Sequence, residues 1–227
     1  MLPRAPVLTD LLVRSDIRRA TDLARVARPS VPTGFPALDA QLPGGGWPSG
    51  ALTEILPAHQ GIGELRLLGP ALAGLSRKGR RLAWIAPPHL PYAPALDAAD
   101  IDLSTLLIVR TTSLTDTLWA AEQCLRSAAC GAVLLWPQQL KYAELRRLQL
   151  AADGTDAMAV LFRPPSAADQ ASPAALRLGL ATADGGLAVR ILKRRGAALQ
   201  SPVRVEIGPP TARTPFSAPL PDTTTPA

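Results

Sequence analysis

Residues 31–68 limit the possible folds of this 227-residue chain more than any other stretch. They read as a loop, a short apolar strand at 52–56, a glycine-containing turn and then a helix that starts at Glu64. This order is typical of a phosphate-binding loop, in which backbone N–H groups and a helix N-terminus hold phosphate oxygens. The sequence therefore predicts a nucleotide-binding type of fold.

The residues that such a loop needs for nucleotide chemistry are missing. A working loop carries Lys for the outer phosphates and Ser or Thr for Mg²⁺, whereas residues 57–64 read PAHQGIGE. We expect this degenerate loop, which contains His59, Gly61, Gly63 and Glu64, to hold no nucleotide, no metal and no other cofactor. The carboxylate of Glu64 is expected to take the place of the lost anion.

Apolar segments of strand length alternate with helix-like segments along the rest of the chain, which predicts a parallel sheet with right-handed crossovers. Strands are expected at 81–86, 106–109, 132–136 and 158–163, and helices at 8–28, 64–77, 91–99, 115–128 and 142–152. Three further strands at 176–181, 187–193 and 203–207 are expected to form a C-terminal antiparallel extension, with a turn at residues 184–186.

Part of the stretch at 31–68 resembles the opening of the ATPase core of the RecA recombinase family. The residues that carry this resemblance are Thr33, Gly34, Leu38, Asp39, Gly44, Gly45, Gly46, Pro48, Gly50, Glu54 and Ile55. Within that superfamily, the altered turn and the ILKRRG stretch at 191–196 resemble the ImuA family, and the SulA family is a more distant relative. The resemblance covers residues 8–207 and implies an α/β, RecA-like core with a mostly parallel central sheet flanked by helices.

The resemblance also locates two acidic positions of a working ATPase. The family places a carboxylate that activates water just after the strand expected at 81–86, and an Asp that helps to hold Mg²⁺ at the end of the strand at 132–136. Pro88 and Trp136 stand there instead. Proline cannot accept a proton and indole cannot ligate a hard cation. We therefore predict that the protein is not an enzyme.

The chain divides into three predicted parts. Residues 1–30 form an N-terminal helix and linker, residues 31–207 the core, and residues 208–227 a Pro/Thr-rich tail that we expect to be disordered. Charges interrupt the N-terminal apolar residues, so we expect no signal peptide, and no apolar run suits a membrane span. We predict a cytoplasmic protein in which Cys124 and Cys130 are reduced thiols.

Two basic groups are candidate partner-binding sites in this chain of net charge +6. Arg14, Arg18 and Arg25 share one face of the N-terminal helix, and Lys193, Arg194 and Arg195 follow the predicted hairpin. The first group is either a solvated helix face or, as the resemblance implies, a contact with a neighbouring protomer. The second group is either a solvated turn or a contact with a RecA protomer, a partner's acidic tail or DNA phosphate. The loop at 164–175 has no Lys, Arg or aromatic residue, so we expect any DNA contact to be indirect.

The resemblance to ImuA implies a RecA-like pseudo-ATPase that acts as an accessory protein in SOS-induced translesion DNA synthesis and mutagenesis. Its expected partners are RecA and a Y-family polymerase-like protein. The alternative is a SulA-type cell division inhibitor that binds the tubulin-like division protein. A third alternative, an active ATPase with a variant loop, requires an anion to bind without a lysine and beside Glu64, which repels phosphate.

Overall fold

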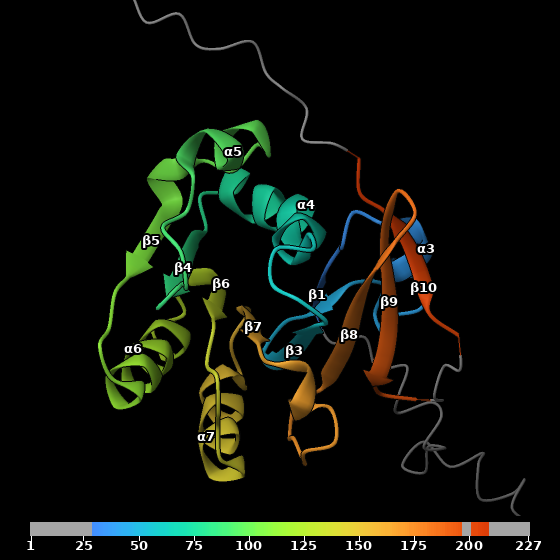
Figure 1. Cartoon of the computed structure of the whole chain (residues 1–227). Coiled ribbons are helices and arrows are strands. Elements are labelled where there is room, and N and C mark those ends of the chain that lie inside the picture. The colour runs from blue at the N-terminus through green and yellow to red at the C-terminus, as the bar shows by residue number, and fades with distance from the viewer. Residues whose placement is uncertain (1–28, 197–200, 209–227) are drawn as a thin grey trace, which may run out of the picture.

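The computed structural model describes residues 29–196 and 201–208. Its main sheet has eight strands in the order β10-β9-β8-β3-β7-β6-β4-β5 (Figure 1). The bounds are β3 Ala51–Pro57, β4 Arg81–Ile85, β5 Leu106–Val109, β6 Cys130–Leu135, β7 Met158–Phe162, β8 Leu176–Ala183, β9 Gly186–Lys193 and β10 Val203–Glu206. The helix expected at 8–28, with Arg14, Arg18 and Arg25, and the tail at 209–227 lie outside the described residues.

The sheet is mostly parallel, as the sequence predicts. The pairs β8–β3, β3–β7, β7–β6, β6–β4 and β4–β5 are all parallel, whereas β9 and β10 are antiparallel to their neighbours. The antiparallel extension is thus joined to the core more closely than the sequence suggests. Its first strand, β8, pairs in parallel with β3 before it turns back into β9.

Helices cover both faces of this sheet. On one face lie α4 (Glu64–Arg77), α3 (Pro36–Asp39) and α5 (Ala93–Ala98), and on the other α6 (Leu114–Arg126) and α7 (Tyr142–Ala152). Two apolar clusters follow from this arrangement, one containing the buried leucines of α4 and one those of α6 and α7. Short elements complete the fold: β1 (Ser30–Val31) paired with β2 (Trp47–Pro48), η1 (Leu103–Thr105) and η2 (Pro165–Ala167).

The central strand and helix match the sequence-based prediction because local signals define them. All residues of β3 are buried, as expected for a parallel strand covered on both faces. Helix α4 ends where Gly79 adopts φ +70° and Arg80 N donates to Leu75 O, a glycine-dependent helix end. None of the described helices combines enough length with enough apolar character to cross a bilayer.

One glycine fixes the loop before β2 against α4. Gly34 has φ +86°, and a Cβ atom at this position would lie 2.4 Å from Cβ of Pro70. Only a residue without a side chain permits this approach. The segment at 32–35 therefore packs directly on the turn of α4 that contains the helix-internal proline.

Candidate functional site

The degenerate loop connects β3 to α4, and the side chain of Glu64 accepts hydrogen bonds from its backbone. Glu64 is the first residue of α4, and its carboxylate turns back over the loop. Its Oε1 accepts a hydrogen bond from Gly61 N at 2.9 Å, and its Oε2 accepts one from Gly63 N at 3.1 Å. Backbone N–H groups before a helix are the donors that hold phosphate in functional loops. Here an internal carboxylate satisfies two of them.

Glycine makes this geometry possible. Gly61 and Gly63 have φ values of +80° and +113°, in a region that L-residues with side chains avoid. The resulting backbone directs both N–H groups towards the same carboxylate. The loop has thus retained its glycines while Lys and Ser or Thr are missing.

The space beside the loop is small. A hollow of about 160 Å³ is lined by Pro57, Ala58, His59, Gln60, Glu64, Trp136, Gln138, Phe162, Arg163, Pro164 and Pro165. Sites for nucleotide-sized ligands usually have volumes of roughly 300–1,000 Å³. His59 lies at the rim and is exposed. The hollow is therefore a poor match to a nucleoside triphosphate with its metal.

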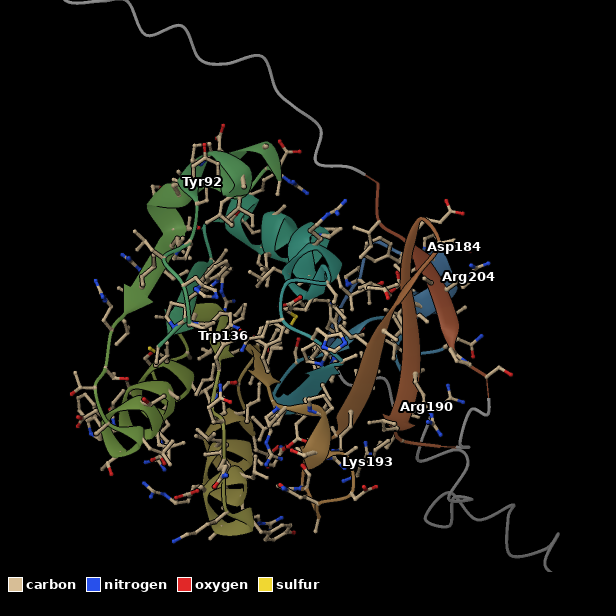
Figure 2. The ribbon with its side chains drawn as sticks, in the orientation of Figure 1. Tyr92, Trp136, Asp184, Arg190, Lys193 and Arg204 are labelled. Atoms are coloured by element: carbon tan, nitrogen blue, oxygen red, sulfur yellow. The ribbon has the colours of Figure 1, made fainter. Side chains whose placement is uncertain are left out.

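Aromatic side chains fill the space beside the loop, at the carboxyl ends of the central strands β6 and β7. Trp136 directly follows β6 (Figure 2). Its ring stacks on Phe162 with centroids 5.0 Å apart. Trp84 of β4 contacts the same indole in a tilted arrangement with centroids 5.8 Å apart. Pro88 follows β4 and offers no group that accepts a proton. Trp136 supplies packing and Pro88 is exposed. Neither side chain is a ligand for Mg²⁺.

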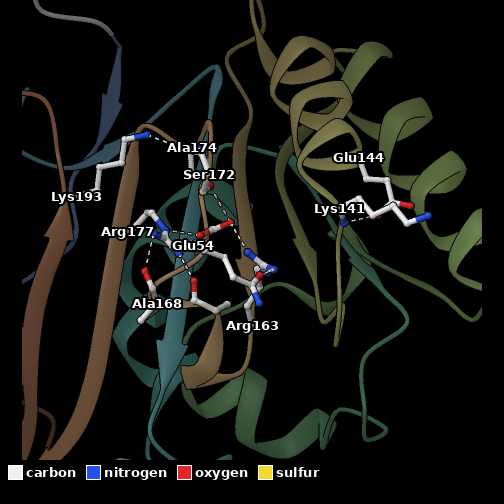
Figure 3. Close-up of polar contacts among 11 residues, drawn as sticks. Glu54, Lys141, Glu144, Arg163, Ala168, Ser172, Ala174, Arg177 and Lys193 are labelled. Carbon is white, nitrogen blue, oxygen red and sulfur yellow. Dashed lines mark hydrogen bonds and ion pairs between the residues drawn. The ribbon is translucent and has the colours of Figure 1, made fainter.

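A buried ion network on the opposite face of β3 was missed by the sequence analysis. Glu54 has no exposed surface. Its Oε2 lies 2.6 Å from Arg177 Nε, and its Oε1 lies 3.1 Å from Arg163 Nη1 (Figure 3). Ser172 Oγ also donates to Oε1 at 3.0 Å. A single Glu inside the apolar strand ALTEILP was the available signal, because a buried carboxylate requires cations or donors.

The same arginines hold the loop at 164–175. Arg177 donates to the carbonyl oxygens of Ala167 at 2.6 Å and Ala168 at 3.0 Å. Arg163 Nη2 donates to Gln170 Oε1 at 2.8 Å. The loop at 164–175 is therefore fixed to β3 and β8 by buried charge.

Two of the three residues in the basic cluster form hydrogen bonds with other parts of the chain. Lys193 Nζ donates to Ser172 O at 2.7 Å, and Arg194 Nη1 donates to Gln41 O. Arg195 is exposed. The cluster thus connects the end of β9 to the loop at 164–175 and to the segment after α3. Its role as a partner contact stays a prediction, as does that of Arg14, Arg18 and Arg25.

The two cysteines are free thiols that interact with each other. A hydrogen bond from Cys130 lowers the pKa of Cys124 to about 7. The same hydrogen bond, together with burial, raises the pKa of Cys130. Within the described ranges, no three or more His, Cys, Asp or Glu side chains are grouped in a way that could hold a metal ion.

Comparison of the sequence with known proteins shows which family the chain belongs to. Residues 50–159, which run from the start of β3 into β7, match the family model described as cell division inhibitor SulA. A cell division inhibitor SulA from Pectobacterium atrosepticum is 31% identical over 124 residues, which cover 54% of this chain and 73% of that protein. The chain belongs to the SulA family. The SulA of Edwardsiella piscicida is 32% identical over 98 residues, which cover 43% of this chain and 58% of that relative's length.

Membership of the SulA family corrects the functional prediction. The names of the matched relatives indicate inhibition of cell division. The prediction of an ImuA-type pseudo-ATPase in translesion synthesis, with RecA and a Y-family polymerase-like protein as partners, was wrong, and the SulA alternative is the better supported one. The error has a physical reason: the residues behind the ImuA resemblance form the turn between β3 and α4, the end of β9 and the residues directly after it. These elements build the sheet and identify no partner.

Proposed function

We propose that this protein inhibits cell division by binding a tubulin-like division protein, and that it does so without catalysis. The SulA-family match across residues 50–159 carries this proposal. The match contains the whole degenerate loop and Trp136, so the features that distinguish this site from a nucleotide site lie inside the family segment. The proposal places the protein in the cytoplasm, where such a division protein polymerises.

The geometry of the loop supports the non-catalytic part of the proposal. The carboxylate of Glu64 occupies two backbone donors at the helix start, and it would repel a phosphate group. Trp136 and Phe162 fill the adjacent sheet edge with stacked rings. Because this position is occupied by the protein's own side chains, we propose that the protein acts on a partner through its outer surface.

The first test measures polymerisation of the tubulin-like division protein from the same bacterium. We expect the purified full chain to bind this protein and to reduce its GTP-driven assembly, as followed by light scattering and sedimentation. An unrelated protein of similar size and positive charge is the control, because a basic chain binds acidic polymers nonspecifically. Unchanged assembly together with no detectable binding would overturn the proposal.

A second test addresses catalysis separately. We expect no binding heat when ATP and Mg²⁺ are titrated into the protein in a calorimeter, and no phosphate release. An affinity in the micromolar range, equivalent to about −8 kcal/mol, would overturn the non-catalytic part and leave the inhibition of assembly to be judged by the first test.

A further inference from the structure

The two cysteines of this chain lie on consecutive elements and are in contact with each other. Cys124 is in the last turn of α6 and is partly exposed, whereas Cys130 is the first residue of β6 and is buried. Both side chains pack in the same apolar cluster. The thiol of Cys130 donates a hydrogen bond to the sulfur of Cys124. Because the sequence contains only these two cysteines, a disulfide within one chain must join them.

Hydrogen bonds hold the turn that brings the two thiols together. Ser127 Oγ donates to Cys124 O at 2.9 Å at the end of α6. Ala128 has φ +54°, a left-handed conformation of the kind that ends helices and redirects the chain. Arg80 Nη2 donates to Cys130 O at 3.1 Å and thereby fixes the start of β6. The folded backbone therefore keeps the two cysteines beside each other.

The two thiols differ in reactivity, because only a thiolate is a good nucleophile and only one of them is accessible. The hydrogen bond from Cys130 lowers the pKa of Cys124 to about 7, so a large share of this thiol is ionised at neutral pH. The same hydrogen bond and burial raise the pKa of Cys130, although the charges of Arg81 and Arg80 act in the opposite direction. Cys124 is therefore the residue that a small oxidant reaches and oxidises first.

We propose that Cys124 and Cys130 are a site of reversible oxidation, at which hydrogen peroxide converts the two thiols into a disulfide within the chain. This inference does not depend on the proposed function. First, the Cys124 thiolate attacks one peroxide oxygen. The O–O bond breaks, hydroxide leaves, and Cys124 becomes a sulfenic acid.

In the second step the sulfur of Cys130 attacks the sulfur of Cys124. The S–O bond breaks, and the departing hydroxide takes the proton of Cys130 and leaves as water. The two thiols together lose two electrons and two hydrogen atoms, and the peroxide is reduced to water. Oxidation of Cys124 also removes the thiolate that keeps Cys130 protonated, and the nearby charges of Arg80 and Arg81 then favour its ionisation. The first step therefore prepares the second.

Peptide mapping of the full chain tests the inference. Trypsin cleaves after Arg126, so Cys124 falls in peptide 111–126 and Cys130 in peptide 127–141. The reduced protein is treated with hydrogen peroxide at neutral pH, remaining thiols are blocked with N-ethylmaleimide, and the digest is analysed without reductant. We expect the intact monomer to lose about 2 Da, the mass of two hydrogen atoms. The two peptides should appear as a linked pair that dithiothreitol separates.

Two substitutions test the order of the steps, with circular dichroism to check that both variants remain folded. Cys130→Ala should stop the reaction at a Cys124 sulfenic acid, which dimedone traps. Cys124→Ala should leave Cys130 as an unmodified thiol, because that side chain is only 3% exposed. Oxidation of Cys130 in this variant at the wild-type rate would overturn the order.

Three results in the wild-type chain would overturn the inference itself. In the first, Cys124 is oxidised but no linked pair of peptides forms. In the second, the linked pair forms only after the protein is unfolded in urea. In the third, the disulfide joins two chains, which a non-reducing gel shows as a dimer.

Discussion

Arg177 Nε lies 2.6 Å from Glu54 Oε2, and both side chains are almost completely removed from solvent. Burying two charges costs several kcal/mol each, and attraction offsets this only if the remaining polar atoms are also satisfied. Glu54 meets this condition through Arg163 and Ser172. Arg163 Nε has no hydrogen-bond partner among the described residues, so the network carries one unsatisfied donor.

Replacing Glu54 should destabilise the fold strongly. Glu54→Gln keeps the shape of the side chain but leaves Arg163 and Arg177 buried without their counter-charge. We expect the free energy of unfolding to fall by about 3–5 kcal/mol, as measured by urea denaturation. Asp184→Asn is the control, because its 3.9 Å pair with Arg204 is exposed and such pairs contribute little. A Glu54→Gln protein as stable as the control would contradict the role assigned to the network.

Replacing Glu64 should loosen the degenerate loop. Glu64→Ala removes the acceptor of the Gly61 and Gly63 N–H groups, and loss of a helix-start acceptor costs about 0.5–2 kcal/mol. We expect amide hydrogen exchange at both glycines to accelerate. Glu144→Ala is the matched control, because Glu144 accepts from Lys141 N at 2.7 Å at the start of α7. It should accelerate exchange at Lys141 only. Unchanged exchange at Gly61 and Gly63 would show that the carboxylate does not close the loop in solution.

Replacing Trp136 should remove the aromatic packing at the end of β6. Trp136 is partly buried, so we expect Trp136→Ala to lower the free energy of unfolding by about 2–4 kcal/mol, near the lower end of values for buried aromatics. The near-ultraviolet circular dichroism of the Trp84–Trp136 pair should also weaken. Trp119→Ala is the control, because that indole is 64% exposed. Equal losses in both variants would argue against a packing role for Trp136.

Cys124 should react as a thiolate near neutral pH. Its pKa is lowered from 9.0 to about 7, so the rate of alkylation by iodoacetamide should have its midpoint near pH 7. Cys130→Ala removes the donor and should move that midpoint up towards 9. Cys124→Ser is the blank for the assay. A wild-type midpoint near the ordinary thiol value would refute the hydrogen bond between the two thiols.

The lowered pKa of Cys124 also makes the free energy of unfolding depend on pH, in a defined direction. Because the pKa of Cys124 is lower in the folded protein, its stabilising contribution is present above the ordinary value of 9.0 and is lost as pH falls through about 7. The raised pKa of Cys130 acts in the opposite direction as pH rises past its ordinary value. Alkylation therefore reports on Cys124 more directly than an unfolding curve does.

The sequence predicted the elements well where a short-range signal exists. Helix 64–77 and strand 106–109 match α4 and β5 at both ends, because apolar periodicity and helix-end residues act within one or two turns. The position of Glu64 at the start of α4 followed from the same local pattern. The internal capping of the loop is a contact over three residues at most, so it too was within reach of sequence reasoning.

Only the tertiary structure decided which charges are paired. Glu54 pairs with Arg163 and Arg177, which lie 109 and 123 residues away in the sequence. Lys193 and Arg194 donate hydrogen bonds to backbone carbonyl groups that are also distant in the sequence. The parallel pairing of β8 with β3, and the open edge of β5, also depend on the order of strands in the sheet. Local patterns determine where a strand or helix begins and ends. Long-range packing determines its neighbours, and thereby which polar side chains are buried, paired or left exposed.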